Sequence, residues 1–182
     1  MPEMPQILRT EIVARSRLFQ IEQVDLRFAN GVEAQYERLT GSGRGSVLVV
    51  PMPDADTLLL VREYAAGVHR YELGFPKGII EPQELAEQAA NRELMEEIGF
   101  GARQLQHLTA LTIAPGYLAH TTHVVLARDL YECELSGDEP EAIEVVPWHL
   151  SRMSELLSRP DFTEARSLAA LFLVKEMLNH GR

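Results

Sequence analysis

Three glutamates near the end of one predicted helix have the residue type and spacing of a metal site. Glu93, Glu96 and Glu97 stand at i, i+3 and i+4, and a helix that turns about 100° per residue places them within about 100° of one another. The same stripe carries small alanines at 86–90, so it should face the protein. Like charges beside a packed face repel unless a cation lies among them. The alternative is an ordinary solvated, glutamate-rich helix end.

The residues around this stripe favour the metal site. Carboxylate oxygens are hard ligands that suit Mg²⁺ or Mn²⁺. Gly78 precedes the predicted helix and lets the backbone approach closely, so the carbonyl of Lys77 could join the ligands, although Gly78 could also be a simple turn glycine. Arg92 lies about two turns from Glu84, which it could reach, or it could neutralise a neighbouring glutamate.

The segment 78–100 resembles the Nudix box, the signature of a family of hydrolases, at each of its defined positions. These positions are Gly78, Glu84, Arg92-Glu93-Leu94, Glu96-Glu97 and Gly99-Phe100. The resemblance implies a loop–helix–loop in which Glu93, Glu96, Glu97 and the Lys77 carbonyl hold two or more Mg²⁺ or Mn²⁺ ions. It also implies that Arg92 and Glu84 orient the site. Leu85 departs from the pattern, because many relatives have a helix-capping serine there.

Features outside the box resemble the ADP-ribose pyrophosphatase branch of the family, and within it the ADP-compound hydrolases. Pro115 follows Phe100 by 15 residues, an offset that is a mark of this branch. The resemblance implies hydrolysis of the diphosphate bridge in ADP-ribose, diadenosine polyphosphates or NADH, with release of AMP. The stretch 75–78, Phe-Pro-Lys-Gly, departs from typical ADP-ribose enzymes and resembles diadenosine polyphosphate hydrolases.

Hydrolysis needs a carboxylate that takes a proton from water. In this branch the base often comes from a loop after the box, and the acidic loop 137–141 follows at that place. We therefore expect the base to be Glu139, then Glu141, with Glu93 as a further candidate, although the loop could also be a solvated acidic turn.

Three residues are candidate substrate contacts: Arg62, Tyr117 and Glu72. An arginine can pair with a phosphate, and a tyrosine can stack on a base or a ribose. Arg62 could instead form a surface ion pair, and Tyr117 could be an aromatic residue at the edge of the core.

The elements that must position these residues follow from the apolar pattern. Pro82 to Ile98 reads as a helix that ends before Gly99. Residues 19–28 and 32–39 around Asn30-Gly31 predict a β-hairpin. Residues 46–52 and 57–62 predict two paired strands. Further strands are expected at 71–75, 105–113, 123–130 and 143–146, and helices at 153–157 and 164–178.

Together these elements predict an α/β fold of the Nudix type, in which a mixed β-sheet lies between helices. A glycine-rich stretch at 41–45 marks a linker. We expect an N-terminal antiparallel β segment at 1–44 and a Nudix hydrolase domain at 45–182. The N-terminal segment is too small to stand alone, and the resemblance implies that it forms a homodimer.

The composition of the chain indicates which partners it can bind and which cell compartment it suits. The net charge of -10 disfavours nucleic acid as a partner, because it repels a polyanion. We expect no membrane partner, since no apolar run approaches the roughly 20 residues that span a bilayer. A single cysteine, Cys133, and no secretory signal favour a cytoplasmic protein.

Two rival functions remain at this stage. One is a pyrophosphatase for another nucleotide sugar. The other is a non-catalytic Nudix module that binds ADP-ribose. The second is disfavoured, because the carboxylates of the box are all present and no length remains for a DNA-binding domain.

Overall fold

The computed structural model describes residues 2–40, 43–137 and 139–180. These form two compact units, residues 1–44 with 112–121 and residues 45–111 with 122–182. Gly41 and Ser42 of the predicted linker and Asp138 of the acidic loop lie outside the described residues. The structure groups residues 112–121 with the N-terminal segment, and the functional division at residue 45 stays a prediction.

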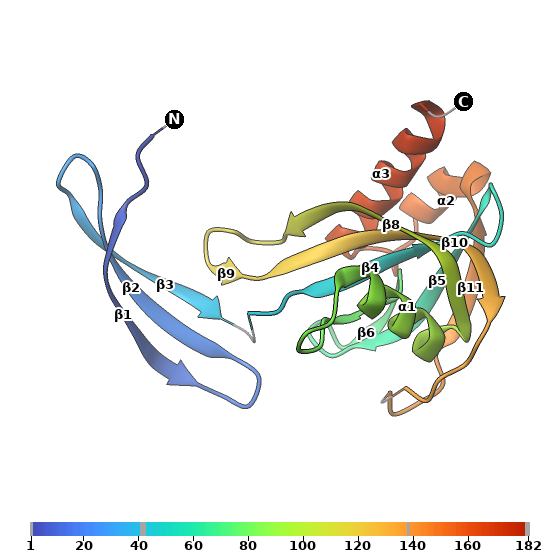
Figure 1. The fold of residues 1–182 in the computed structure, drawn as a ribbon, viewed down its shortest axis with the longest axis horizontal. Helices are drawn as coiled ribbons and strands as arrows, with labels where there is room; N and C mark the ends of the chain where they lie inside the picture. Colours follow the sequence, from blue (N-terminus) through green and yellow to red (C-terminus); the bar gives the residue numbers. More distant parts are fainter. Residues whose placement is uncertain (1, 41–42, 138, 181–182) are drawn as a thin grey trace. The chain divides into compact units, whose positions relative to one another are not determined.

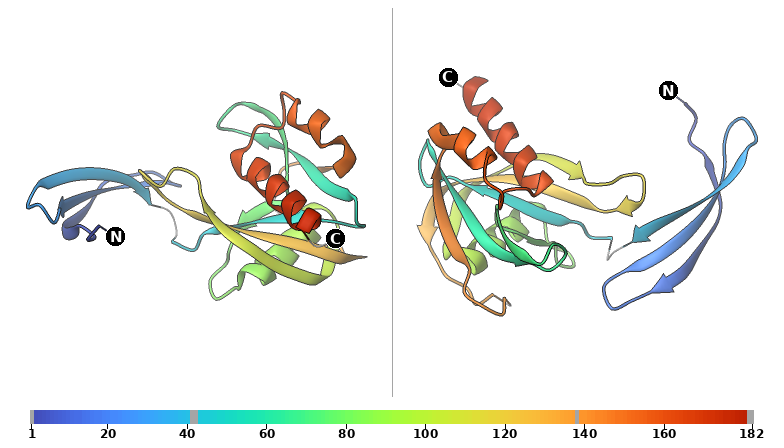
Figure 2. Two further views of the ribbon diagram at one scale, coloured as in Figure 1. Left: turned by 90° about the horizontal axis from the view of Figure 1, so that it is seen from above. Right: turned by 180° about the vertical axis from the view of Figure 1, so that it is seen from behind.

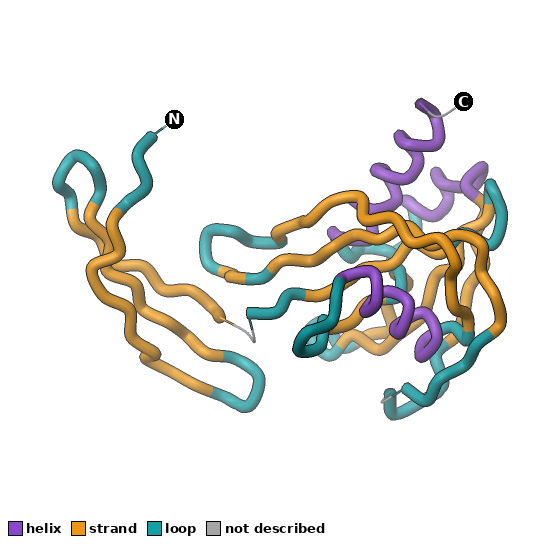
Figure 3. The backbone as a smooth tube through the Cα atoms, viewed as in Figure 1, coloured by secondary structure: helices purple, strands orange, loops and turns teal. Residues whose placement is uncertain are grey.

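The first unit consists of strands and loops (Figure 3). Its sheet has the order β1-β2-β3-β9. The bounds are β1 Gln6–Arg15, β2 Gln20–Arg27, β3 Glu33–Thr40 and β9 Leu118–Ala119. The hairpin β2–β3 is antiparallel, and Gly31 adopts φ +83°, the left-handed conformation that its turn requires. The predicted hairpin is therefore confirmed, whereas β1 and β9 were not predicted.

The described residues of the second unit form two sheets and three α-helices (Figure 1). One sheet has the order β7-β4-β10-β8 and the other β11-β5-β6. The strands are β4 Ser46–Pro51, β5 Thr57–Ala65, β6 Arg70–Gly74, β7 Lys77–Ile79, β8 Phe100–Thr112, β10 Thr121–Glu132 and β11 Glu144–His149. The helices are α1 Ala86–Glu97, α2 Met153–Leu157 and α3 Ala165–His180, with a 3-10 turn, η1, at Leu150–Arg152. Every strand and helix predicted for this unit is present; α2 has its predicted bounds, and the other elements have shifted ends.

The predicted pairing of the strands at 46–52 and 57–62 is wrong. β4 pairs in parallel with β10 and antiparallel with β7. β5 instead pairs with β6 and β11 in the other sheet. All of β4 and the first half of β5 are buried on both faces, so their continuous apolar runs identify strands and carry no information about partners.

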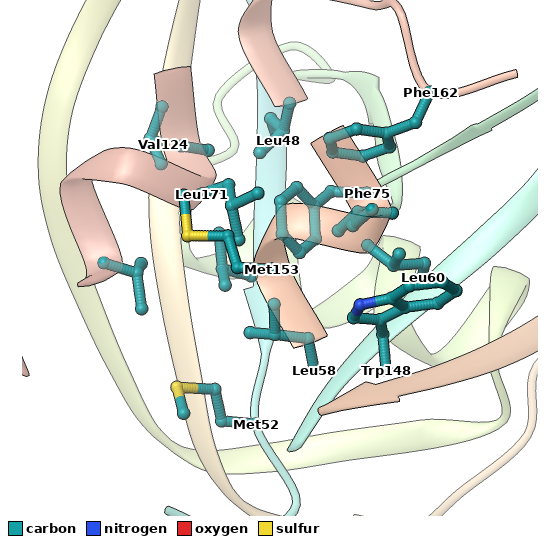
Figure 4. Packing of buried hydrophobic residues seen from close by; sticks show 14 of the residues in the cluster. Leu48, Met52, Leu58, Leu60, Phe75, Val124, Trp148, Met153, Phe162 and Leu171 are labelled. Atoms are coloured by element: carbon teal, nitrogen blue, oxygen red, sulfur yellow. The ribbon is translucent and has the colours of Figure 1, made fainter. Parts of the chain in front are cut away.

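Two hydrophobic clusters divide the second unit into layers. Side chains of β4, β5 and β10 alternate between the two clusters, because successive residues of a strand point to opposite faces. One cluster contains Leu48, Leu60 and Val124 with α2 and α3, and Figure 4 shows its packing around Phe75 and Trp148. The other contains Val49, Val61 and Val125 with Ala89, Ala90 and Leu94 of α1. Figure 2 shows α1 and α3 on opposite faces of the strands, so the predicted arrangement of sheet between helices is confirmed.

None of the helices in the described ranges is long and apolar enough to cross a bilayer.

Candidate active site

Helix α1 begins later than its sequence suggests. The predicted start at Pro82 is wrong, because Gln83 has φ +69° and Leu85 is extended, so the first helical residue is Ala86. Leu85 lacks a side chain that could cap the helix, but its N–H donates to Gln88 Oε1 at 2.9 Å, which replaces part of the missing cap. Gly99 has φ +73° just beyond the helix, as predicted for a C-terminal glycine.

Two of the three glutamates face the packed side of α1. Ala89, Ala90 and Leu94 are fully buried on this side, and Glu93 and Glu97 retain only 7% and 6% exposure. The sequence argument placed all three carboxylates on the stripe of small residues, and the structure buries Glu93 and Glu97 there but leaves Glu96 partly exposed. Burial raises the pKa of Glu93 and raises that of Glu97 to about 8, because a charged carboxylate loses hydration there.

Arg92 connects the carboxylates to the loop before the helix. Its guanidinium donates to Glu84 Oε1 at 3.0 Å, to Glu93 Oε1 at 2.8 Å and to Glu96 Oε2 at 2.8 Å. It also donates to the carbonyl of Ile79 at 2.9 Å. The predicted contact between Arg92 and Glu84 is therefore present. Together with the bond to Ile79, it holds the loop before the helix against α1.

The strand β7 supplies the wall opposite α1. The backbone N–H of Lys77 donates to Glu97 Oε1 at 3.2 Å. Gly78 lies so close to Glu93 that a Cβ atom on it would stand 1.9 Å from Glu93 Oε1, which is far inside contact distance. A glycine is therefore needed at position 78 so that the backbone of β7 can lie against the Glu93 carboxylate. A role as a simple turn glycine would not account for this contact.

The arrangement of donors fits a divalent cation. Glu97 Oε2 is buried and has no hydrogen-bond partner among the described residues. A buried carboxylate oxygen without a partner costs free energy, which a cation would offset. No three carboxylate, thiol or imidazole side chains in the described ranges are already arranged to hold an ion. Arg92 Nη1 instead donates to one oxygen of Glu93 and to one oxygen of Glu96, which holds these two carboxylates next to each other.

An acidic loop between β10 and β11 lies beside the end of α1. It lines a cavity of about 640 Å³ together with Glu96 and Glu97. Glu139 stands near the helix, because both its carboxylate and Glu96 Cβ lie within 4 Å of where a Cβ on Gly137 would stand. Its charge also contributes to the raised pKa of Glu93. Glu141 points elsewhere and accepts a hydrogen bond of 2.6 Å from the hydroxyl of Tyr71.

Of the three predicted substrate residues, Arg62 and Glu72 stand on the paired strands β5 and β6, and the charged group of each already has partners. Arg62 forms ion pairs with Glu144 at 2.8 Å and Asp161 at 2.5 Å. Glu72 accepts hydrogen bonds from Thr163 Oγ1 at 3.0 Å and from Arg70. Tyr117 belongs to the first unit, where it is 60% exposed and lines a cavity of about 610 Å³.

Two residues at the site were not singled out from the sequence. Tyr71 holds the acidic loop through Glu141, and Glu63 forms an ion pair of 2.5 Å with the ammonium group of Lys77. Neither belongs to the box motif. The only available signal was their place on short predicted strands just before it, which does not reveal long-range partners.

Comparison with known proteins identifies the family of the chain. Residues 43–171 match the model of the NUDIX domain. The chain belongs to the Nudix hydrolase family. Residues 5–38 match the N-terminal domain of NudE-type Nudix hydrolases. The predicted family, the Nudix fold and the predicted class of enzyme are therefore confirmed, and Nudix hydrolases generally require divalent metal ions.

Individual relatives agree with this Nudix assignment. The chain is 53% identical to ADP compounds hydrolase NudE of Escherichia coli (strain K12), over 96% of this chain and 93% of the relative. It is 28% identical to ADP-ribose pyrophosphatase of Bacillus subtilis (strain 168), over 90% and 91% of the two chains. A solved structure described as the crystal structure of ADP compounds hydrolase is similar over 100% of this chain and 97% of that chain. Its TM-score is 0.92 and its identity 51%.

Proposed function

We propose that this Nudix hydrolase cleaves the diphosphate bridge of ADP compounds with water and releases AMP. The substrate class comprises ADP-ribose, diadenosine polyphosphates such as diadenosine triphosphate, and NADH. The names of the two similar enzymes support this class. The observation that carries the proposal is the buried Glu97 carboxylate, whose Oε2 atom lacks a partner among the described residues beside two further glutamates of the box.

The proposed metal ligands are Glu93, Glu96, Glu97 and the carbonyl of Lys77, with two or more Mg²⁺ or Mn²⁺ ions per site. Bound divalent ions would neutralise the diphosphate and orient the attacking water. The protein contributes a buried frame for them, since Arg92 and Gly78 fix where the Glu93 carboxylate lies. Arg92 also supplies a positive charge that balances the glutamates.

Glu139 is the general base we favour. Its carboxylate lies close enough to Glu93 to raise the pKa of that residue, and it lines the cavity next to Glu96. In this role Glu139 takes one proton from water as the water oxygen attacks phosphorus and the bridging P–O bond breaks. Glu141 is less suited, because the Tyr71 hydroxyl already occupies one of its oxygens. Glu93 remains an alternative base.

Tyr117 is retained as a proposed contact to the base or ribose, since its ring is exposed and lines a cavity. Arg62 and Glu72 are better explained as structural residues. Both of their charged groups already have partners within the same unit.

One panel of assays tests this function. AMP release is measured with ADP-ribose, diadenosine triphosphate, NADH and a non-adenine nucleotide sugar, with Mg²⁺ and with Mn²⁺. We expect Glu97→Gln and Glu139→Gln to lower turnover at least ~100-fold, the scale of a lost electrostatic contribution to catalysis. Glu155→Gln removes the same charge from an exposed ion pair on α2 and should leave turnover unchanged.

Three results would contradict the proposal. Faster cleavage of the non-adenine nucleotide sugar would assign the chain to the rival nucleotide-sugar pyrophosphatases. Binding of ADP-ribose without AMP release would assign it to non-catalytic modules. Normal turnover of Glu139→Gln would remove Glu139 as the base and leave Glu93 as the alternative.

We further propose a homodimer formed through the N-terminal β segment, residues 1–44, and a cytoplasmic location. The strand β1 supports the dimer, because it is an edge strand exposed along its whole length. The single cysteine, Cys133, supports a reducing compartment, since it leaves no disulfide within the chain.

A further inference from the structure

Lys77 places a positive charge next to the proposed metal site. Its backbone N–H donates to Glu97 Oε1, while its ammonium group donates to Glu63 Oε2 at 2.5 Å. The side chain of Lys77 is 26% exposed and that of Glu63 40% exposed. A partly exposed pair of this kind contributes little to the free energy of unfolding. The main effect of the Lys77–Glu63 ion pair is therefore to fix the position of the Lys77 ammonium group.

The alternative position for this ammonium group is the Glu97 carboxylate. Lys77 acts on the charged form of Glu97 through space, so the two side chains are within electrostatic reach. Glu97 Oε2 is buried and has no hydrogen-bond partner among the described residues. A lysine ammonium on a flexible four-carbon stem can turn towards such an oxygen when nothing else holds it. It would then occupy the place of a divalent cation.

We infer that Glu63 is a positioning residue that keeps the Lys77 ammonium group off Glu97 and so leaves that carboxylate free for a divalent ion. The role is distinct from that of a ligand, since Glu63 acts through Lys77. It rests on the proposed metal site and adds a residue from β5 that lies outside the Nudix box.

The test is a double-mutant cycle read out by metal binding without substrate. Mn²⁺ is titrated into metal-free protein, and free Mn²⁺ is followed by electron paramagnetic resonance. Four proteins are compared: wild type, Glu63→Gln, Lys77→Met and the double variant. Lys77→Met keeps the backbone N–H and carbonyl of residue 77 and removes only the ammonium group. Thermal melting of each protein checks that it is folded.

We expect Glu63→Gln to weaken Mn²⁺ binding about tenfold in the presence of Lys77, within the range measured for directly coupled residues. In the Lys77→Met background the same change should weaken binding by less than about threefold, the effect of one partly solvated charge. Lys77→Met alone should bind Mn²⁺ at least as tightly as wild type. Glu155→Gln, which removes a charge from an exposed ion pair on α2, is the matched control and should bind as wild type does.

Two outcomes overturn the inference while the metal site stands. One is that Glu63→Gln weakens Mn²⁺ binding equally with and without Lys77. Glu63 would then act on the ion only through its own negative charge. The other is no weakening at all. A wild-type protein that fails to bind Mn²⁺ would instead remove the proposed metal site, and the inference with it.

Discussion

The two oxygens of the Glu97 carboxylate have different surroundings. Oε1 accepts the N–H of Lys77, and Oε2 has no partner in the described part of the chain. With 6% exposure, the residue must either keep its proton or hold an uncompensated charge. A residue chosen for stability alone would be neutral here, so the burial of Glu97 supports its proposed role as a metal ligand, in which a bound ion would offset this cost.

Replacing Glu97 with glutamine should therefore stabilise the metal-free protein. The unfolded chain loses the Glu97 proton near pH 4.5, whereas the folded protein keeps it to a pH of about 8, since burial raises its pKa. Between these values the folded state binds more protons, so raising the pH across this window lowers the wild-type free energy of unfolding. Glutamine has no proton to lose, and the advantage of Glu97→Gln should grow from pH 5 to pH 8 by about 3 kcal/mol.

Urea unfolding in EDTA at several pH values measures this difference. The control is Glu155→Gln, whose side chain is 59% exposed on α2 and pairs with Arg152, and whose difference from wild type should not vary over the same range. A constant difference for Glu97→Gln as well would mean that the carboxylate is hydrated in solution.

Among the elements, the acidic loop between β10 and β11 depends on a contact from β6. The Tyr71 hydroxyl donates to Glu141 Oε1 at 2.6 Å. Tyr71 also packs edge-on against Tyr64 of β5, with ring centroids 5.7 Å apart. Residues 133–143 contain no helix or strand in their described part, so this bond stabilises a segment with few other constraints (Figure 3).

Tyr71→Phe should loosen the acidic loop without unfolding the unit. The change removes one hydrogen bond to a charged group, and the exposure of Tyr71 keeps the loss of stability small. Amide hydrogen exchange in residues 134–143 should become about fivefold faster, and turnover should fall by less than Glu139→Gln lowers it. Tyr64→Phe is the control, because its hydroxyl contacts His69 rather than the loop. Unchanged exchange in the loop would show that Glu141 needs no anchor.

The sequence alone predicted which face of α1 carries the glutamates, but not the residue at which the helix begins. The stripe through Glu93 and Glu97 follows from helical geometry, and the structure buries both side chains as that geometry requires. The start of α1 could not be predicted, since Pro82 suits a first helical turn and nothing nearby announces the positive φ of Gln83. Local patterns do not encode such a change of backbone direction.

Contacts between segments that are far apart in the chain could not be predicted from the sequence either. Arg62 looked like a phosphate ligand because its type suits that role, yet Glu144 and Asp161 already pair with it from 82 and 99 residues away. The separation of β4 and β5 into two sheets could not be predicted for a similar reason. Strands buried on both faces show no alternation of apolar and polar residues that would indicate their partner.

At the scale of the whole molecule, the strand β1 stands out within the first unit. It lies at the edge of its sheet, spans ten residues and is exposed throughout. Four of its residues are large and apolar: Ile7, Leu8, Ile12 and Val13. Monomeric proteins usually shorten, charge or cover an edge of this kind, because its free backbone groups pair readily with another chain. A second copy of the chain would cover it.

Wild-type protein should therefore sediment at about twice the 20.4 kDa mass of one chain. The double variant Ile12→Lys/Val13→Lys adds two charges to β1 at its irregularity between Ile12 and Ala14, where both side chains are at least 40% exposed, so the sheet itself should tolerate it. Burying two ammonium groups in a dimer interface is costly, and we expect the mass to fall to that of a monomer. Phe172→Lys, at a 52% exposed position on α3, is the matched control and should stay dimeric. A monomeric wild type at micromolar concentration, or a double variant that remains dimeric, would exclude β1 from the interface.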